Sequence, residues 1–193
     1  MGLSERQTEI IDCSIEIIDK RGIQGLTIKN ISKEIGISEP AIYRHFKSKT
    51  DIILAILDNF KVMAEFLSDA MDNFEGEAIE KIGFMFSKML EMFLHQPSIV
   101  SVIFSEEIFK NEDSLLVEIR EILNLHQQTV EKIIEKGQEQ NNVRVDVDKQ
   151  SLALLVMGAL RLLVKRWDLN QHNFKLEKEG TKLLDSLKII MSK

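Results

Sequence analysis

The chain has 193 residues, of which 44% are hydrophobic and 29% charged, with nine Gly, two Pro and a single Cys. This composition is typical of one globular domain, or of a small domain joined to a larger one, and the scarcity of Gly and Pro favours an all-α fold. The single Cys13 excludes an intramolecular disulfide framework and a Cys-based zinc site, and it fits a reducing compartment.

The net charge of −6 is unevenly distributed along the chain. Residues 20–49 hold seven Lys or Arg but only two Glu, so the remainder is more acidic than the total suggests. A short basic segment on an acidic body is typical of a small DNA-binding module joined to a larger domain. A solvated basic helix face would give the same count, and charge alone does not decide between the two.

No targeting or membrane segment is evident in the sequence. The first five residues lack the apolar core of a secretory signal peptide. The longest apolar run, 152–160, covers about half a bilayer before Arg161 interrupts it. We therefore expect a cytoplasmic protein without a membrane partner.

Start and stop signals predict two helices at the beginning of the chain. Ser4 and Gln7 form a capping-box pattern, and the helix that follows is expected to end at Gly22. Thr27 can cap a second helix over 28–35.

A third short helix follows after a tight turn. Gly36 breaks the second helix, and Ser38 can cap a helix over 39–45, where Pro40 is tolerated in the first turn. Two short helices joined by a turn of about three residues centred on a glycine form the helix-turn-helix pattern. The second of these helices is the one that enters the DNA major groove.

The rest of the chain is also predicted to be helical. Ser48 and Asp51 form another capping box, at the start of a long helix that runs to about Met71. Apolar periodicity predicts further helices over about 77–95, 98–109, 113–140, 148–168 and 174–192.

The last two helices are apolar enough to need a partner surface, and the small pair Gly158-Ala159 would allow a close helix approach. The apolar residues on which this rests are Leu152, Leu155, Val156, Ala159, Leu160, Leu163, Leu176, Leu183, Leu184 and Leu187.

The segment from Thr27 to Lys49 resembles the tetracycline-repressor (TetR/AcrR) family of bacterial transcriptional regulators. The resemblance is carried by Gly25-Leu26-Thr27-Ile28, by Ile31 with Ile35-Gly36-Ile37-Ser38, and by Ala41-Ile42-Tyr43-Arg44-His45-Phe46 with Lys47, Lys49 and Leu54. It covers about 50 residues directly, and the remainder matches in length, helical content and position.

This resemblance implies an all-α homodimer of about nine helices. A three-helix DNA-binding domain would occupy residues 1–47, and a ligand-binding and dimerisation domain residues 48–193. The helices over about 148–168 and 174–192 would pair with those of the partner subunit in a four-helix bundle. A small hydrophobic effector would bind the core and release the protein from a palindromic double-stranded operator.

The resemblance therefore favours a ligand-released repressor, while two alternatives stay open: an activator, and a DNA-binding protein of this fold that answers to no small ligand. An enzyme is disfavoured because catalysis needs a converging set of groups, whereas His95, His126 and His172 are widely separated. We expect no catalytic residues, no metal and no cofactor.

The resemblance assigns phosphate contacts to Tyr43, His45, Lys49 and Thr27, although Tyr43 could instead be a packing aromatic. Base edges would be read by the third helix, where Arg44 suits the O6 and N7 atoms of guanine and Ala41 can contact a thymine methyl. The unusual Glu39 could accept a hydrogen bond from a cytosine amino group or complement the positive helix N-terminus, and we favour the second role. The complete predicted set is Thr27, Lys29, Ser38, Glu39, Pro40, Ala41, Tyr43, Arg44, His45 and Lys49.

Helices that line the effector pocket in relatives carry Met and Phe here, which give a deformable apolar surface. The candidates are Phe60, Met63, Phe66, Phe86, Met89, Phe93, Phe104 and His126, although each could equally be a core residue. Glu106 and Glu107 could pair with a cationic group or form a solvated face. For Trp167 we favour a place at the dimer interface.

Overall fold

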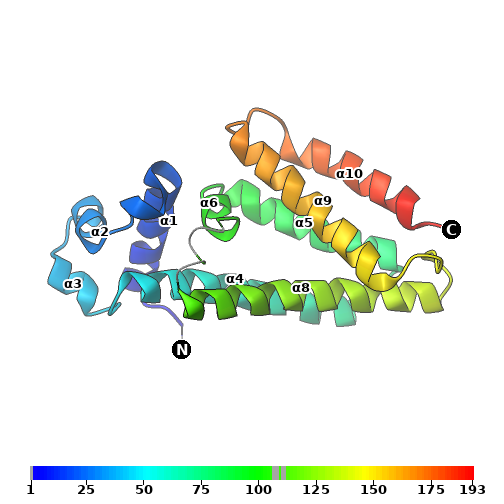
Figure 1. Ribbon diagram of the computed structural model, residues 1–193, viewed down its shortest axis with the longest axis horizontal. Helices are drawn as coiled ribbons and strands as arrows, with labels where there is room; N and C mark the ends of the chain where they lie inside the picture. The colour runs from blue at the N-terminus through cyan, green and yellow to red at the C-terminus, as the bar shows by residue number, and fades with distance from the viewer. Residues whose placement is uncertain (1, 106–108, 110–111) are drawn as a thin grey trace. The chain divides into compact units, whose positions relative to one another are not determined.

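The computed structural model describes residues 2–105, 109 and 112–193, and within these ranges the chain is all-α with nine helices and no strands (Figure 1). The all-α prediction is therefore confirmed. The helices are α1 (Glu5–Gly25), α2 (Ile28–Ile35), α3 (Glu39–Tyr43), α4 (Lys49–Asn73), α5 (Ala78–His95), α6 (Ile99–Ile103), α8 (Asp113–Glu139), α9 (Lys149–Leu169) and α10 (Leu176–Met191).

The chain forms two compact units. Unit 1 comprises Met1–Val62 and Ser98–Glu121, and unit 2 comprises Met63–Pro97 and Ile122–Lys193. The long helices α4 and α8 therefore each contribute residues to both units.

Unit 1 is built around α1. The capping box predicted at the start of this helix is confirmed, whereas the helix continues past Gly22, its predicted end, to Gly25. The Ser4 hydroxyl accepts a hydrogen bond from the Gln7 amide at 3.3 Å, while the Gln7 side chain accepts one from the Ser4 amide at 3.0 Å. Gly22 takes a left-handed φ of 66° and interrupts the helix, a conformation that glycine adopts without strain.

Helix α6 packs against α1 within unit 1. The hydroxyl of Ser98 donates to the Glu16 carboxylate at 2.8 Å, and that of Ser101 donates to Asp19 at 2.6 Å. The predicted helix over 98–109 is too long, because α6 ends at Ile103 and the next amides turn back to the carbonyls of the helix itself. Residues 106–108, including Glu106 and Glu107, lie outside the described residues.

Two predicted helix starts differ in detail from the structure. Ser38 occupies the N-cap of α3, but its side chain makes no capping bond, and only its carbonyl accepts from the Ala41 amide. At the start of α4 the Ser48 hydroxyl accepts from the Asp51 amide as expected, whereas the Asp51 carboxylate reaches one residue further back and accepts from the amide of Lys47 at 3.0 Å.

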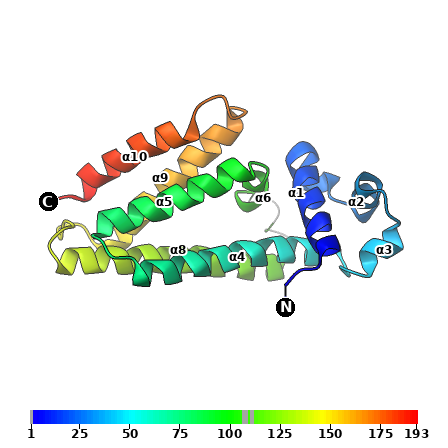
Figure 2. The same cartoon turned by 180° about the vertical axis from the view of Figure 1, so that it is seen from behind.

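In unit 2, α10 packs against both α5 and α9 (Figure 2). Gly180 allows the close approach of α10 to α5, since a Cβ there would lie 2.3 Å from a methyl carbon of Leu90. The ring of Trp167 is buried within its own chain and lies 4.0 Å, centroid to centroid, from that of His172. This corrects the expectation for Trp167, because its side chain has almost no surface left to offer a partner subunit.

Within the described residues, no helix combines the length and the apolar character that are needed to cross a bilayer.

Candidate nucleic-acid interface and effector core

The start of α2 is fixed by bonds that span only a few residues. The Thr27 hydroxyl accepts from the Asn30 amide at 3.1 Å, and the Asn30 side chain donates to the carbonyl of Gly25 at 2.7 Å. Because a hydroxyl both accepts and donates, this cap leaves the Thr27 proton able to reach a phosphate oxygen.

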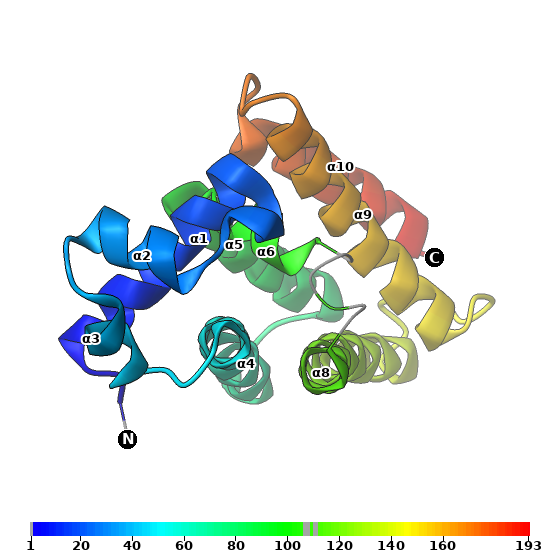
Figure 3. The same cartoon turned by 60° about the vertical axis from the view of Figure 1, so that its left-hand side comes forward.

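The turn between α2 and α3 is closed by Gly36, which has a left-handed φ of 80°. The amides of Gly36 and Ile37 both donate to the Ser32 carbonyl, at 2.9 and 3.0 Å. This C-cap orients α3 relative to α2, as the helix-turn-helix pattern requires (Figure 3).

Helix α3 presents one face to the core of unit 1 and the other to solvent. Ile42 is fully buried and Phe46 is buried beside it, whereas Tyr43 between them is 51% exposed. The helix ends at Tyr43, two residues earlier than predicted, because the amides of His45 and Phe46 both return to the Ile42 carbonyl and carry Phe46 inward.

All ten predicted DNA-contacting residues lie in unit 1 and have accessible surface. Ala41 and His45 are half-buried, and the other eight are exposed. Their exposure is what a DNA contact needs, and their contacts with DNA remain predictions.

Two further basic residues of this region were not among the predicted DNA contacts. Lys33 lies one turn beyond Lys29 on α2, and Lys47 precedes α4; both side chains are exposed. The charge count over residues 20–49 was the signal that could have identified them. The one acidic residue of α2, Glu34, is paired with Arg21 at 3.4 Å, which reduces its effect on this basic surface.

The predicted effector residues are divided between the two units. Phe60 and Phe104 belong to unit 1, and the other six belong to unit 2. In unit 2, Phe86, Phe93 and His126 are buried and Met89 is half-buried, whereas Met63 and Phe66 are exposed, the latter by 68%. Burial lowers the pKa of His126 below its usual 6.5, so that the imidazole is neutral near pH 7.

Unit 2 contains a groove of about 230 Å³ between α5 and α10, which is lined in part by Phe86 among the predicted effector residues. A second recess, of about 50 Å³, is lined by the end of α4, the start of α5 and the last turns of α8, and by none of the predicted residues. The sequence signal that could have indicated it is the pair Lys132 and Lys136, one turn apart on α8.

Helix α9 has apolar residues on two faces. Leu152, Val156, Leu160 and Leu163 are buried within the chain. The expectation that they, with Leu176 and Leu187, form a partner surface is therefore wrong, because periodicity alone does not say which face is inward.

The outward face carries Leu154, Leu155, Leu162 and Leu169, all more than half exposed. Leu155, Gly158, Leu162, Lys165 and Leu169 recur at alternating intervals of three and four residues, which is the spacing of a helix-pairing seam. A Cβ added at Gly158 would meet no atom within 4 Å.

Two family models match the chain. The model for bacterial regulatory proteins of the tetR family matches residues 10–56, and the model for the C-terminal region of MAATS-type transcriptional repressors matches residues 79–192.

Individual relatives are more distant. The chain is 23% identical over 183 residues to the fatty acid metabolism regulator protein of Bacillus subtilis (strain 168), over 93% of this chain and 92% of that protein. It is 21% identical over 189 residues to the probable acrEF/envCD operon repressor of Escherichia coli (strain K12), over 96% and 86%. The crystal structure of the transcriptional regulator FadR from Bacillus subtilis in complex with stearoyl-CoA has a TM-score of 0.80 at 21% identity, over 93% and 96% of the two chains.

Proposed function

The chain belongs to the TetR family of bacterial regulatory proteins, and from this premise we propose that it represses transcription in the cytoplasm as a homodimer on a palindromic operator. We further propose that a long-chain fatty acyl thioester is the effector that releases it. The observation that carries the proposal is the amphipathic third helix, in which Tyr43 and Arg44 face solvent next to a fully buried Ile42.

The proposed DNA contacts follow from the chemistry of the exposed side chains. Arg44 can donate two hydrogen bonds to the O6 and N7 atoms of guanine, and Ala41 can contact a thymine methyl. Tyr43, His45, Lys49 and Thr27 would donate to phosphate oxygens, as would Lys29. Glu39, in the first turn of α3, would complement the positive end of the helix, while Ser38 and Pro40 lie beside it at the groove.

The proposed dimer forms through α9 and α10. The exposed seam of Leu155, Leu162 and Leu169 is the kind of surface that a second copy of the same helix buries, and Gly158 at its centre allows the two backbones to approach. Ile189, 78% exposed, extends the apolar surface onto α10. Two subunits paired in this way would present two third helices to two operator half-sites.

The proposed effector chemistry is apolar. Phe86 and Phe93 are buried in unit 2 together with a His126 that burial keeps neutral, so the interior favours a hydrocarbon chain over a charged ligand. The fatty acid regulator relative and the stearoyl-CoA complex support a fatty acyl thioester as the first compound to test.

Fluorescence anisotropy of labelled DNA from upstream of the protein's own gene would test this proposal. We expect binding that unlabelled DNA of the same sequence displaces and random DNA does not, and release on addition of stearoyl-CoA but not of free coenzyme A. Equal affinity for random DNA would contradict the operator assignment. Specific binding that no acyl thioester reverses would favour the alternative of a DNA-binding protein without such an effector, and transcription in vitro would separate repression from activation.

A further inference from the structure

The recess at the end of α4 has an excess of positive charge among its lining residues. Its charged residues are Lys81, Lys132, Lys136 and Asp72, three ammonium groups for one carboxylate. We call this site the lysine recess. It lies wholly within unit 2, and its full lining is Ser68, Met71, Asp72, Gly76, Ala78, Lys81, Thr129, Lys132, Ile133, Lys136, Gly137 and Gln140.

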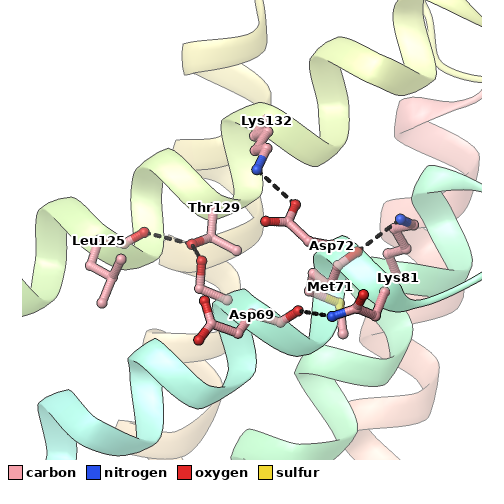
Figure 4. Close-up of polar contacts among 9 residues, drawn as sticks. Asp69, Met71, Asp72, Lys81, Leu125, Thr129 and Lys132 are labelled. Atoms are coloured by element: carbon pink, nitrogen blue, oxygen red, sulfur yellow. Dashed lines mark hydrogen bonds and ion pairs between the residues drawn. The ribbon is translucent and has the colours of Figure 1, made fainter.

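Lys81 of α5 and Lys132 of α8 both point toward the end of α4 (Figure 4), and Lys136 lines the same recess. The ammonium of Lys132 lies 2.7 Å from Asp72, and that of Lys81 donates to the Met71 carbonyl at 2.9 Å. The pKa of Asp72 is lowered first by the hydrogen bond and charge of Lys132 and then by the charges of Lys136 and Lys81. All three ammonium groups are therefore close enough to act on one carboxylate.

Folding alone does not account for this charge. The Lys132–Asp72 pair is about half exposed on both sides, and surface pairs of this kind contribute little to stability. Lys81 and Lys136 also lie near the C-terminal ends of α4 and α8, each of which carries roughly half a negative charge. These two helix ends offset about one of the two excess positive charges, so the lining retains a net positive charge of about one.

The recess also offers neutral hydrogen-bonding groups. The hydroxyl oxygens of Thr129 and Ser68 lie 2.9 Å apart, and Thr129 reaches the Leu125 carbonyl at 2.8 Å. One N–H of Lys81 is used by Met71, and an ammonium has three. A small anion with several acceptor oxygens would thus find donors on more than one side.

We propose that the lysine recess binds a phosphate group. A phosphate dianion carries more charge than a carboxylate and presents its oxygens in several directions, which matches three ammonium groups approaching from α5 and α8. On binding, Lys132 exchanges the Asp72 carboxylate for a phosphate oxygen. The phosphate is either free or part of a larger ligand such as the nucleotide end of an acyl thioester, and only this second source rests on the proposed function.

Calorimetric titration of the full chain with inorganic phosphate, pyrophosphate and coenzyme A, at constant ionic strength, tests the proposal. We expect saturable binding of at least one of these at one site per chain. The double variant K132Q/K136Q should bind at least about tenfold more weakly, since it loses two charged hydrogen bonds to the anion. K20Q/K88Q is the matched control, because it removes two other exposed and ion-paired lysines, and its affinity should not change.

The variant Asp72→Asn should bind the anion several-fold more tightly, because it removes the competing carboxylate. Tighter binding in Asp72→Asn and weaker binding in K132Q/K136Q together indicate a specific site, because damage to the fold would weaken binding in both variants. No saturable binding of any of the three compounds, or equal weakening in K132Q/K136Q and in K20Q/K88Q, would overturn the proposal.

The three compounds also distinguish the source of the phosphate. Lysine-dependent binding of inorganic phosphate as tight as that of coenzyme A indicates the free anion, whereas lysine-dependent binding of coenzyme A alone indicates a larger ligand. These titrations include neither DNA nor an acyl chain. A failure of the operator or effector experiment therefore does not affect the conclusion about anion binding in the lysine recess. Conversely, stearoyl-CoA could release the operator while no anion binding depends on the lysines. That result would overturn the phosphate site in the lysine recess and leave the proposed effector standing.

Discussion

The proposed DNA-contacting segment of unit 1, residues 27–49, and the lysine recess of unit 2 hold their polar side chains in place in different ways. Around α2 the bonds are local: Thr27 caps an amide three residues away, and Asn30 reaches a carbonyl five residues away. In unit 2 the bonds of Thr129 to Ser68 and of Lys132 to Asp72 join residues about 60 positions apart.

This difference affects how each region responds to change. Local caps form together with the short helix they terminate, so a substitution there perturbs one turn. A contact between distant helices exists only after α4 and α8 have packed, so its geometry depends on the whole unit. The experiments below test this contrast, beginning with the surface that depends most on distant partners.

The largest effect is expected from Leu162→Glu at the centre of the α9 seam. Leu162 is 62% exposed in the single chain, and a carboxylate there would be buried against its counterpart in the partner subunit. We expect monomers at micromolar concentration in analytical ultracentrifugation. Operator affinity should fall by about 100-fold or more, because two half-sites are no longer bound by a linked pair.

Val117→Glu is the control for this variant, since it places the same charge on an exposed apolar residue of α8 outside the seam. A Leu162→Glu protein that stays dimeric and keeps its operator affinity would show that α9 does not form the interface.

The features that could be predicted from the sequence are those fixed by local contacts, and the features that were missed depend on contacts between distant residues. The limits of α2, its Thr27 cap and its end at Gly36 were all predicted correctly, because each depends on residues within one turn. The outward face of α9 was predicted only in part: Leu155 and Gly158 were named, but Leu162 and Leu169 were passed over in favour of Leu160 and Leu163, which are buried. The lysine recess was missed for the same reason, since no local pattern connects Asp72 to residues 132 and 136.

The next effects concern the two kinds of DNA contact that we propose for Tyr43 and Arg44. Tyr43→Ala should weaken binding to operator and random DNA alike by about tenfold, since it removes a phosphate contact that carries no sequence information. Arg44→Ala should cost about 1–3 kcal/mol on the operator and much less on random DNA. Both side chains are exposed, so unfolding by urea should be unchanged.

Anisotropy titrations with the two DNAs at two salt concentrations measure this difference. Unchanged affinity of Tyr43→Ala would remove its assignment as a phosphate contact. An Arg44→Ala protein that loses the same factor on both DNAs would show that Arg44 positions the helix and does not read bases.

A smaller, pH-dependent effect is expected from His126. Burial lowers the pKa of this histidine in the folded state, so the unfolded chain binds the proton more readily. Its contribution to stability is therefore complete above pH 6.5 and is lost as the pH falls towards the folded-state pKa, by at most about 1.4 kcal/mol per pH unit. His126→Gln should flatten the dependence of the unfolding free energy on pH below about 6.5. Identical pH profiles for the wild type and His126→Gln would show that the imidazole is not shielded from water.

The smallest effect separates two N-caps that look alike in the sequence. Thr27→Ala removes the hydroxyl that accepts the Asn30 amide and should lower the free energy of unfolding by about 1 kcal/mol. Ser38→Ala should change it by much less, because the Ser38 side chain makes no capping bond and α3 relies on the backbone carbonyl of the same residue. Urea unfolding at a fixed protein concentration measures both, since the stability of a dimer depends on concentration. An equal loss of unfolding free energy in the two variants would mean that the Ser38 hydroxyl caps α3 in solution, and that α2 and α3 begin in the same way.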